Sequence, residues 1–162
     1  MQRLHSKLIL NKYQLIEQIG VGGDGEVWKT IGPNDNIYAL KARPVNENAQ
    51  SFQREFERLR MMRIPNIIRV HEAGIAEGFV YYTMDLANGT DFRTYVQQGR
   101  SSLDRVQRCI SAAKPISYAL AIMHRAGLAH LDLKPDNIIV EENGNPLLLD
   151  FGRSCALGER QI

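Results

Sequence analysis

The sequence is poor in the features that mark secreted, membrane-spanning and metal-cluster proteins. It has only two cysteines, Cys109 and Cys155, which lie far apart. A disulfide framework or a zinc site is therefore not expected, and a reducing cytoplasm fits best. No apolar run is long enough to span a bilayer. The N-terminal segment MQRLHSKLILNKY lacks the apolar core and the cleavage site of a signal peptide.

The chain also lacks an excess of either charge. It has 20 Lys and Arg residues against 18 Asp and Glu residues, and the net charge of +2 argues neither for nor against binding to nucleic acid. Its 162 residues suffice for one domain with a hydrophobic core, and its hydrophobic fraction of 44% is ordinary for a globular protein.

The first half of the chain contains segments of alternating apolar and polar residues, as strands do. Five strands are predicted, over residues 13–19, 26–31, 36–42, 67–71 and 79–84. Between the third and the fourth, Phe52, Phe56 and Leu59 recur at helical spacing, and Pro65 ends that helix. This order predicts a five-stranded antiparallel sheet with one helix against it.

The second half is expected to be mainly helical. Ser101 is a candidate helix cap, and Asp104 is its capping-box partner three residues later. The helix is expected to end at Gly127, with a buried stripe formed by Val106, Ile110, Ala113, Leu120 and Met123. Two short strands, over residues 138–140 and 147–149, flank a turn at Asn143-Gly144.

The run HLDLKPDN at residues 130–137, followed by Asp150-Phe151-Gly152, carries the chemistry. Asp132 can take a proton, and Lys134 can neutralise a phosphate oxygen. Asn137 and Asp150 supply hard oxygen atoms of the kind that Mg²⁺ prefers. A hairpin through the turn between them is expected to bring both oxygens to one place.

These residues resemble the catalytic loop and the metal-binding triplet of the eukaryotic-like serine/threonine protein kinases. The resemblance implies an α+β, bilobal fold with an N-lobe over residues 13–85, a partial C-lobe over residues 86–162, and an N-terminal extension over residues 1–12. Lys134 followed by Pro135 is similar to the serine/threonine-specific branch. The segments GGDGEVW and YYTMDLANGTDF resemble bacterial members of the family.

A glycine-rich segment, GVGGDG at residues 20–25, precedes a strand pattern that includes Val27. Alone, such a segment is equally consistent with a hairpin turn that binds no ligand. The following strand favours the kinase type of loop over a dinucleotide-binding loop, which opens a helix. The family usually has an aromatic residue at the loop tip, whereas this chain has Gly23-Asp24, so a more open lid is expected.

Lys41, in the segment Ala39-Leu40-Lys41, resembles the third-strand lysine of the family. In isolation it is better interpreted as an ordinary exposed strand lysine. The resemblance pairs it with Glu55 of the predicted helix, an ion pair that would hold Lys41 on the α- and β-phosphates. Glu57 is the rival partner, but it lies two positions further along the helix and faces elsewhere.

The resemblance also implies a set of site residues, although each apolar one is equally an ordinary core residue. The catalytic residues would be Asp132, Lys134, Lys41 and Glu55, and the Mg²⁺ ligands Asn137 and Asp150. The residues around ATP would be Ile19, Gly20, Gly22, Gly25, Val27, Ala39, Lys41, Met84, Asp85, Ala87, Asp91 and Ile139.

One position departs from the family pattern: Leu131 stands where the family usually has an arginine. That arginine pairs with a phosphate on the activation loop, and leucine has no donor with which to do so. Control by activation-loop phosphorylation is therefore not expected. Because a family domain continues well beyond Gly152, the chain is expected to be truncated after this triplet, with further domains C-terminal to it.

The expected function is ATP- and Mg²⁺-dependent transfer of the γ-phosphate to Ser or Thr hydroxyls of proteins, in signalling and in the cytoplasm. The expected partners are ATP and a protein substrate, with no nucleic acid and no membrane segment. The alternative is a non-catalytic nucleotide-binding or interaction module, which Leu131 and the truncation favour. A small-molecule phosphotransferase of related fold is a third interpretation, disfavoured by Lys134-Pro135 and Asp150-Phe151-Gly152.

Overall fold

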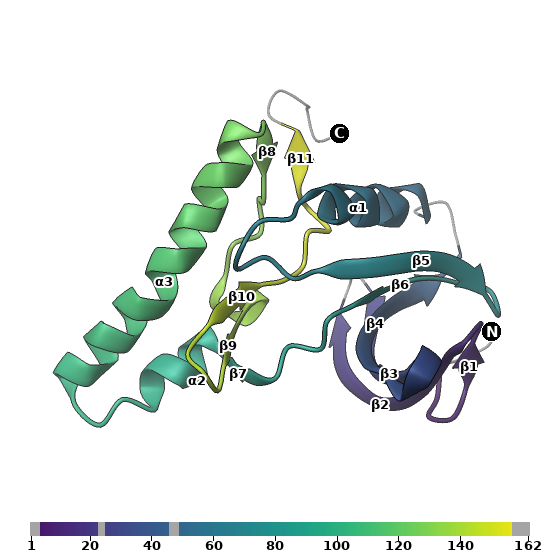
Figure 1. The fold of residues 1–162 in the computed structure, drawn as a ribbon, viewed down its shortest axis with the longest axis horizontal. Helices are drawn as coiled ribbons and strands as arrows, with labels where there is room; N and C mark the ends of the chain where they lie inside the picture. Colours follow the sequence, from purple (N-terminus) through teal and green to yellow (C-terminus); the bar gives the residue numbers. More distant parts are fainter. Residues whose placement is uncertain (1–3, 23–24, 46–48, 157–162) are drawn as a thin grey trace. The chain divides into compact units, whose positions relative to one another are not determined.

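A computed structural model describes residues 4–22, 25–45 and 49–156, and it forms two compact units. The first comprises the described residues up to Met61 together with Arg69–Leu86, and the second comprises Met62–Ile68 and the described residues from Ala87 onward (Figure 1). None of the described helices is both long enough and apolar enough to cross a membrane. The Gly23-Asp24 loop tip and the outer ends of the expected extension and C-lobe lie outside the described residues.

The first unit is built on a six-stranded antiparallel sheet with the strand order β1-β2-β3-β4-β6-β5. Its elements, together with a short 3-10 turn at Pro33–Asp35, are β1 (Ile9–Leu10), β2 (Tyr13–Gly22), β3 (Gly25–Ile31), β4 (Ile37–Pro44), α1 (Ala49–Met61), β5 (Val70–Ala76) and β6 (Phe79–Met84). Helix α1 lies alongside β5 and β6 (Figure 1).

Side chains are buried on both faces of this sheet, as two neighbouring residues of β6 show. Successive residues of a strand point to opposite faces. Tyr81 and Tyr82, neighbours on β6, are each 1% exposed. The ring of Tyr81 meets that of Tyr13 edge-on in one cluster, whereas the ring of Tyr82 packs against Phe52 and Phe56 of α1. The first cluster consists of Leu4, Leu10, Tyr13, Leu15, Trp28, Leu40, Ala42, Phe79 and Tyr81. All residues of β6 are consequently buried.

The sheet differs from the prediction at its two edges. A sixth strand, β1, pairs with β2 inside the segment expected to be an extension. Strand β5 begins at Val70 and continues through Gly74, beyond the predicted strand over residues 67–71. A Cβ on Gly74 would lie 2.7 Å from the Tyr81 hydroxyl oxygen. The glycine therefore leaves room for the Tyr81 side chain, and the strand continues through it.

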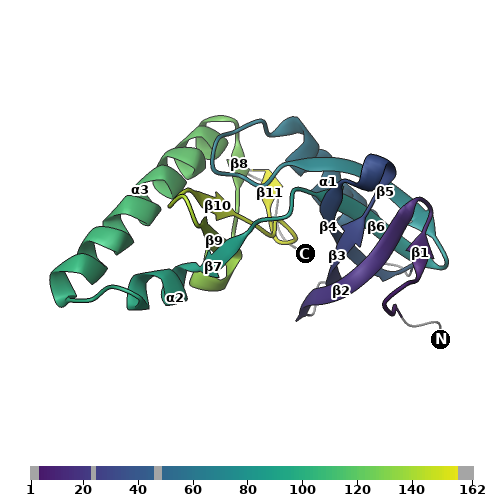
Figure 2. The ribbon, with the colours of Figure 1, turned by 60° about the horizontal axis from the view of Figure 1, so that its bottom comes forward.

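The second unit combines two helices with two small sheets (Figure 2). Its elements, together with a short 3-10 turn at Pro135–Asn137, are β7 (Gly89–Asp91), α2 (Phe92–Gln97), α3 (Ser102–Arg125), β8 (Leu128–Ala129), β9 (Ile138–Glu141), β10 (Pro146–Leu148) and β11 (Cys155–Ala156). Strands β10, β9 and β7 form one antiparallel sheet, and β11 pairs with β8. Ile67, predicted to lie in a strand of the first sheet, instead forms a parallel bridge with Leu148.

Helix α3 begins where the sequence predicts. The Ser101 hydroxyl accepts a hydrogen bond from the Asp104 N–H at 3.1 Å, while the Asp104 carboxylate accepts one from the Arg100 N–H at 2.8 Å. The predicted buried stripe is wrong for three of its five members, because Val106, Ile110 and Ala113 are exposed, whereas Met123 is buried as predicted. The residues of α3 that are buried are Ala112, Ile116, Ala119 and Met123.

Gly89→Ala is expected to lower the free energy of unfolding by roughly 2 kcal/mol, because a Cβ there would lie 2.1 Å from the Val140 carbonyl oxygen in the β7–β9 pair. Gly22→Ala is the matched control, since no described atom lies within 4 Å of its Cβ position. Urea denaturation of the full chain measures both. Equal stability of the two variants would contradict the close approach at Gly89.

Candidate active site

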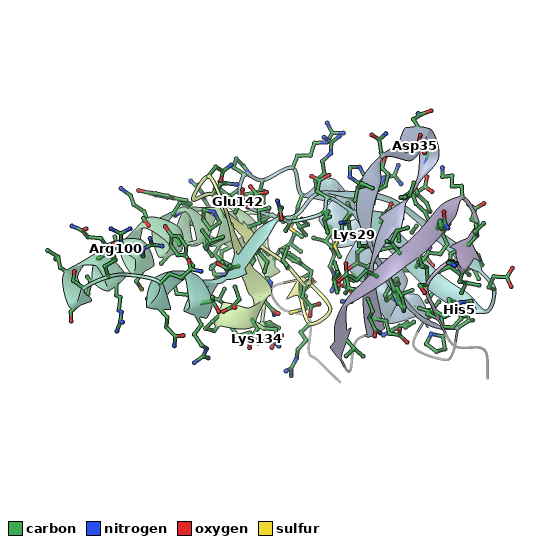
Figure 3. All side chains as sticks on the ribbon, turned by 90° about the horizontal axis from the view of Figure 1, so that it is seen from below. His5, Lys29, Asp35, Arg100, Lys134 and Glu142 are labelled. Carbon is green, nitrogen blue, oxygen red and sulfur yellow. The ribbon has the colours of Figure 1, made fainter. Side chains whose placement is uncertain are left out.

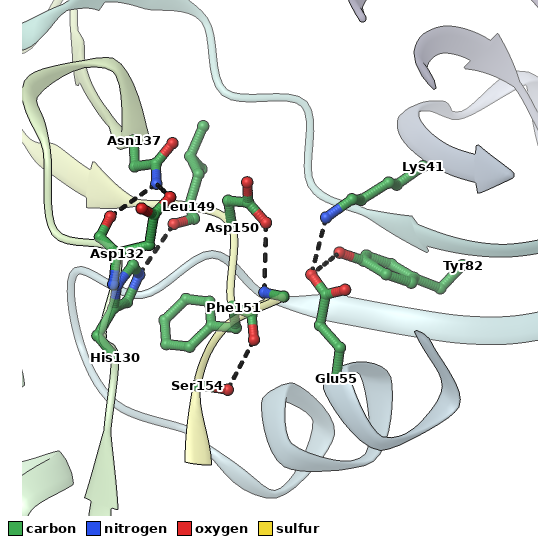
Figure 4. A network of polar contacts seen from close by, with 11 residues as sticks. Lys41, Glu55, Tyr82, His130, Asp132, Asn137, Leu149, Asp150, Phe151 and Ser154 are labelled. Atoms are coloured by element: carbon green, nitrogen blue, oxygen red, sulfur yellow. Dashed lines mark hydrogen bonds and ion pairs between the residues drawn. The ribbon is translucent and has the colours of Figure 1, made fainter. Parts of the chain in front are cut away.

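Lys41 and Glu55 form a buried ion pair in the first unit. The Nζ atom of Lys41, on β4, lies 2.9 Å from Oε1 of Glu55, on α1, and the two residues are 5% and 3% exposed. The hydroxyl of Tyr82 donates a second hydrogen bond to the same oxygen at 2.8 Å (Figure 4). The structure thus brings together the two residues that the resemblance paired and adds a third that the sequence reasoning missed.

Strand register places four of the predicted nucleotide-binding residues on one face of the sheet. Val27 pairs with Lys41, and Lys41 pairs in turn with Tyr82. Directly opposed residues of neighbouring strands point to the same side, and Ala39 and its partner Met84 lie two residues along their strands from this row. Val27, Ala39, Lys41 and Met84 therefore share the face that α1 covers.

The glycine loop is the β2–β3 hairpin, in which Gly20 pairs with Val27 and Gly22 with Gly25. Gly25 has a φ of 121°, which L side chains rarely adopt, and its Cβ would lie 2.6 Å from the Ala42 carbonyl oxygen. Ile19, one residue before Gly20, is 47% exposed. The backbone of this hairpin thus requires glycine at residue 25 independently of any ligand.

Two predicted nucleotide contacts have structural partners of their own. The N–H of Asp85 donates to the Arg69 carbonyl at 2.9 Å, and the Asp85 carboxylate lies 2.7 Å from Nε2 of His71. The backbone N–H and the carboxylate of Asp85 are thus both engaged by neighbouring residues. Asp91 is the N-cap of α2 and accepts hydrogen bonds from both the hydroxyl and the N–H of Thr94, which hold the pKa of its carboxyl below the usual range.

The remaining two predicted contacts, Ala87 and Ile139, belong to the second unit. Ile139 lies on β9, where it pairs with Asp91 of β7, so the register places the N-cap of α2 opposite it. Ala87 precedes β7 in a segment without regular secondary structure.

Asp132 is the centre of a polar cluster in the second unit. Its carboxylate accepts hydrogen bonds from Lys134 Nζ at 2.8 Å and from Asn137 Nδ2 at 3.0 Å, and Nη1 of Arg153 lies 3.9 Å away. The hydrogen bond from Lys134, supported by Asn137 and by the charge of Arg153, holds the pKa of the Asp132 carboxyl below its usual range. Asp132 is therefore ionised at neutral pH.

The pKa of Lys134 is shifted in the opposite direction to that of Asp132. Its hydrogen bond to Asp132 raises the pKa of its ammonium group. Its side chain is 46% exposed and lies at the surface of the second unit (Figure 3). The cation is thus held beside Asp132 on one side and open to solvent on another.

The predicted hairpin between Asn137 and Asp150 is present. Strands β9 and β10 pair in antiparallel register, and the Leu149 N–H donates to the backbone carbonyl of Asn137 at 2.8 Å. Because the Asn137 amide nitrogen is directed at Asp132, its side-chain oxygen points away from that carboxylate (Figure 4). One amide oxygen and one carboxylate form the kind of sparse, hard donor set with which proteins bind Mg²⁺, whose other ligands are phosphates and water.

His130 is a buried residue that contacts both segments of this cluster. It is 2% exposed, and its ring meets that of Phe151 edge-on with the centroids 4.6 Å apart. Its Nδ1 accepts from the Asp132 N–H at 3.3 Å, so its Nε2–H donates to the Leu149 carbonyl at 3.2 Å. Burial lowers the pKa of His130. The neutral imidazole thereby connects the segment of Asp132 to the segment of Asp150.

Sequence reasoning missed Tyr82 and Arg153 as members of these clusters. A phenol in a strand that is buried throughout is a signal for Tyr82, because a buried tyrosine hydroxyl usually finds a partner. For Arg153 the signal is only a cation directly after Asp150-Phe151-Gly152. Its proximity to Asp132 depends on how the chain turns after Phe151, where Ser154 donates back to the Phe151 carbonyl at 2.7 Å.

Comparison with known proteins places the chain among kinases. Residues 13–161 match the family model described as protein kinase domain. The chain therefore belongs to the protein kinase domain family, which confirms the predicted resemblance and the predicted α+β, protein-kinase-like fold.

Individual relatives are plant and bacterial proteins. The CBL-interacting serine/threonine-protein kinase 7 of Arabidopsis thaliana is 30% identical over 93% of this chain and 36% of its own length. The CBL-interacting protein kinase 5 of Oryza sativa subsp. japonica is 28% identical over 93% and 33%. The probable serine/threonine-protein kinase PknB of Lactococcus lactis subsp. lactis is 29% identical over 96% and 26%. The chain thus spans about a third of the length of these relatives or less.

The buried His130 predicts a pH-dependent stability. Its pKa is lower in the folded than in the unfolded chain, so below about pH 6.5 the unfolded chain binds the extra proton. This contribution to stability is present above that pH and is lost as the pH falls from there through the lower pKa of the folded chain. His130→Asn is expected to flatten the fall between pH 7 and pH 5 in urea denaturation, whereas His124→Asn, at an exposed position of α3, keeps it. Identical slopes in both variants would refute the assignment.

Proposed function

We propose that this protein is a kinase that uses ATP and Mg²⁺ to phosphorylate Ser or Thr hydroxyls of protein substrates. The observation that carries the proposal is the cluster at Asp132, in a chain of the protein kinase domain family. There a carboxylate is kept ionised by Lys134 and oriented by Asn137. An ionised, oriented carboxylate can accept the proton of a hydroxyl that attacks a phosphate.

In this proposal the transfer step depends mainly on position and charge. Phosphoryl transfer spreads negative charge over the phosphate oxygens, and a fixed cation stabilises that charge. Asp132 orients the hydroxyl of the substrate and takes its proton. Lys134, exposed on one side, presents its ammonium group to the γ-phosphate. The amide of Asn137 holds the Asp132 carboxylate while this happens.

The first unit would bind the nucleotide. Lys41, held by Glu55, would contact the α- and β-phosphates, and the glycine hairpin would bring backbone N–H groups near phosphate oxygens. The apolar positions Val27, Ala39 and Met84, on the same sheet face as Lys41, support an adenine site there. The Asp85 carbonyl would accept a hydrogen bond from the adenine amino group.

The second unit would supply the remaining contacts. Ile139 would pack against adenine and Ala87 would offer its backbone to the adenine edge, while Asp91 would contact the ribose in addition to its role as a helix cap. Asn137 and Asp150 would hold Mg²⁺ through their side-chain oxygens. When bound, the cation neutralises charge on the β- and γ-phosphates.

The proposed setting is signalling in the cytoplasm, where a free thiol state of Cys109 and Cys155 is maintained. Leu131 is half exposed and offers no donor to a phosphate. Activity is therefore proposed to be independent of phosphorylation in the activation loop. The same residue favours the second candidate function, a non-catalytic nucleotide-binding module, and transfer assays separate the two.

Asp132→Asn is expected to lower kcat by about 10²–10⁴-fold, because the amide cannot accept the proton. Lys41→Met is expected to lower kcat/KM for ATP, because the phosphates lose their cation. Transfer of the γ-phosphate of radiolabelled ATP to a Ser/Thr-containing protein measures both, and circular dichroism confirms the fold. Undiminished transfer in Asp132→Asn would overturn its role. ATP binding by the wild-type chain without any transfer would establish the non-catalytic module.

Phosphatase treatment tests the role of Leu131. Complete dephosphorylation, verified by mass spectrometry of the intact chain, is expected to leave kcat and KM within twofold, because no arginine precedes Asp132 to receive a phosphate. A loss of activity that returns on autophosphorylation would show that control by phosphate persists without that arginine.

A further inference from the structure

Tyr82 and Lys41 both donate to one oxygen atom of Glu55. The distances to Glu55 Oε1 are 2.8 Å from the Tyr82 hydroxyl and 2.9 Å from Lys41 Nζ. All three side chains are buried, at 1%, 5% and 3% exposure. In such surroundings a hydrogen bond to a charged group is stronger than one between neutral groups. The Tyr82 hydroxyl is therefore part of what makes a buried carboxylate tolerable.

The strand register directs both donors at the helix. Lys41 of β4 and Tyr82 of β6 are direct partners in the sheet, so their side chains leave the same face side by side. Glu55 meets them from α1 (Figure 4). Two neighbouring strands thus hold one carboxylate between them, and a helix that turned about its axis would lose both hydrogen bonds together.

The Tyr82 ring packs against the same helix. Its centroid lies 5.0 Å from that of Phe52 and 6.0 Å from that of Phe56. Residues three and four apart share a face of a helix, so Phe52, Glu55 and Phe56 present one surface to Tyr82. Tyr82 therefore contacts α1 in two ways, through its ring and through its hydroxyl.

We propose that Tyr82 is a positioning residue that keeps Glu55 on Lys41, and so keeps Lys41 placed for the nucleotide phosphates, without a phosphorylation event. The inference rests on the proposed kinase function. Leu131 replaces the arginine that would pair with an activation-loop phosphate, and the proposal explains how α1 is held in place without that phosphate. The determinant lies inside the first unit, in a contact between strand and helix.

Tyr82→Phe separates the hydroxyl from the ring, because phenylalanine keeps the packing against Phe52 and Phe56. Tyr81→Phe is the matched control. Tyr81 is equally buried and its hydroxyl also has a partner, Asn11 Nδ2 at 3.2 Å, but it faces the opposite side of the sheet. Both changes remove one buried tyrosine hydroxyl, and only one of them touches Glu55.

The first measurement is amide hydrogen exchange in the full chain, which requires no enzymatic activity. Tyr82→Phe is expected to accelerate exchange in α1 roughly tenfold relative to α3, since one hydrogen bond to a charged group is lost. Tyr81→Phe is expected to leave α1 unchanged. Equal exchange of α1 in the two variants overturns the proposal.

The second measurement is steady-state kinetics with ATP varied. Tyr82→Phe is expected to lower kcat/KM for ATP roughly tenfold or more. It is expected to have no further effect in a Glu55→Ala background, because that change removes the oxygen that accepts from the Tyr82 hydroxyl. Equal effects in both backgrounds would reduce Tyr82 to a packing residue. If the wild-type chain transfers no phosphate, the proposed function fails, yet the exchange measurement still decides whether Tyr82 positions α1.

Discussion

A carboxylate buried between a sheet and a helix is the constraint on which the first unit depends. Glu55 is almost completely removed from water, and a charge in that position is costly unless it is paired and hydrogen-bonded. Lys41 and Tyr82 satisfy it together, which requires β4 and β6 to be neighbours in register and α1 to present one particular face. The aromatic packing of Phe52 and Phe56 against Tyr82 secures the same arrangement.

The second unit satisfies its central carboxylate differently. Asp132 stays partly exposed. Lys134 and Arg153 balance its charge, and Asn137 orients its carboxylate. Two residues near it have left-handed backbone conformations that are uncommon outside glycine: Leu131 with a φ of 60° and Asp150 with a φ of 57°.

Leu131 leaves the residue directly before Asp132 without a charge. Here the nearby cations come from Lys134 and from Arg153, which follows the Asp150-Phe151-Gly152 triplet. The charge of Asp132 is thus balanced by two cations, while Leu131 contributes no hydrogen-bond donor to this cluster. In the first unit, Tyr82 adds a second donor to the Lys41–Glu55 ion pair.

The sequence by itself determined the local features of this protein: alternating strands, the Ser101 cap, and the order of residues that resembles a kinase catalytic loop. These follow from periodicity and from groups a few residues apart. Only the tertiary structure decided that Tyr82 binds Glu55, 27 residues away, and that α3 buries Ala112 while exposing Ile110. The physical reason is that such contacts depend on which face of each element meets another, and one sequence period is compatible with several such pairings.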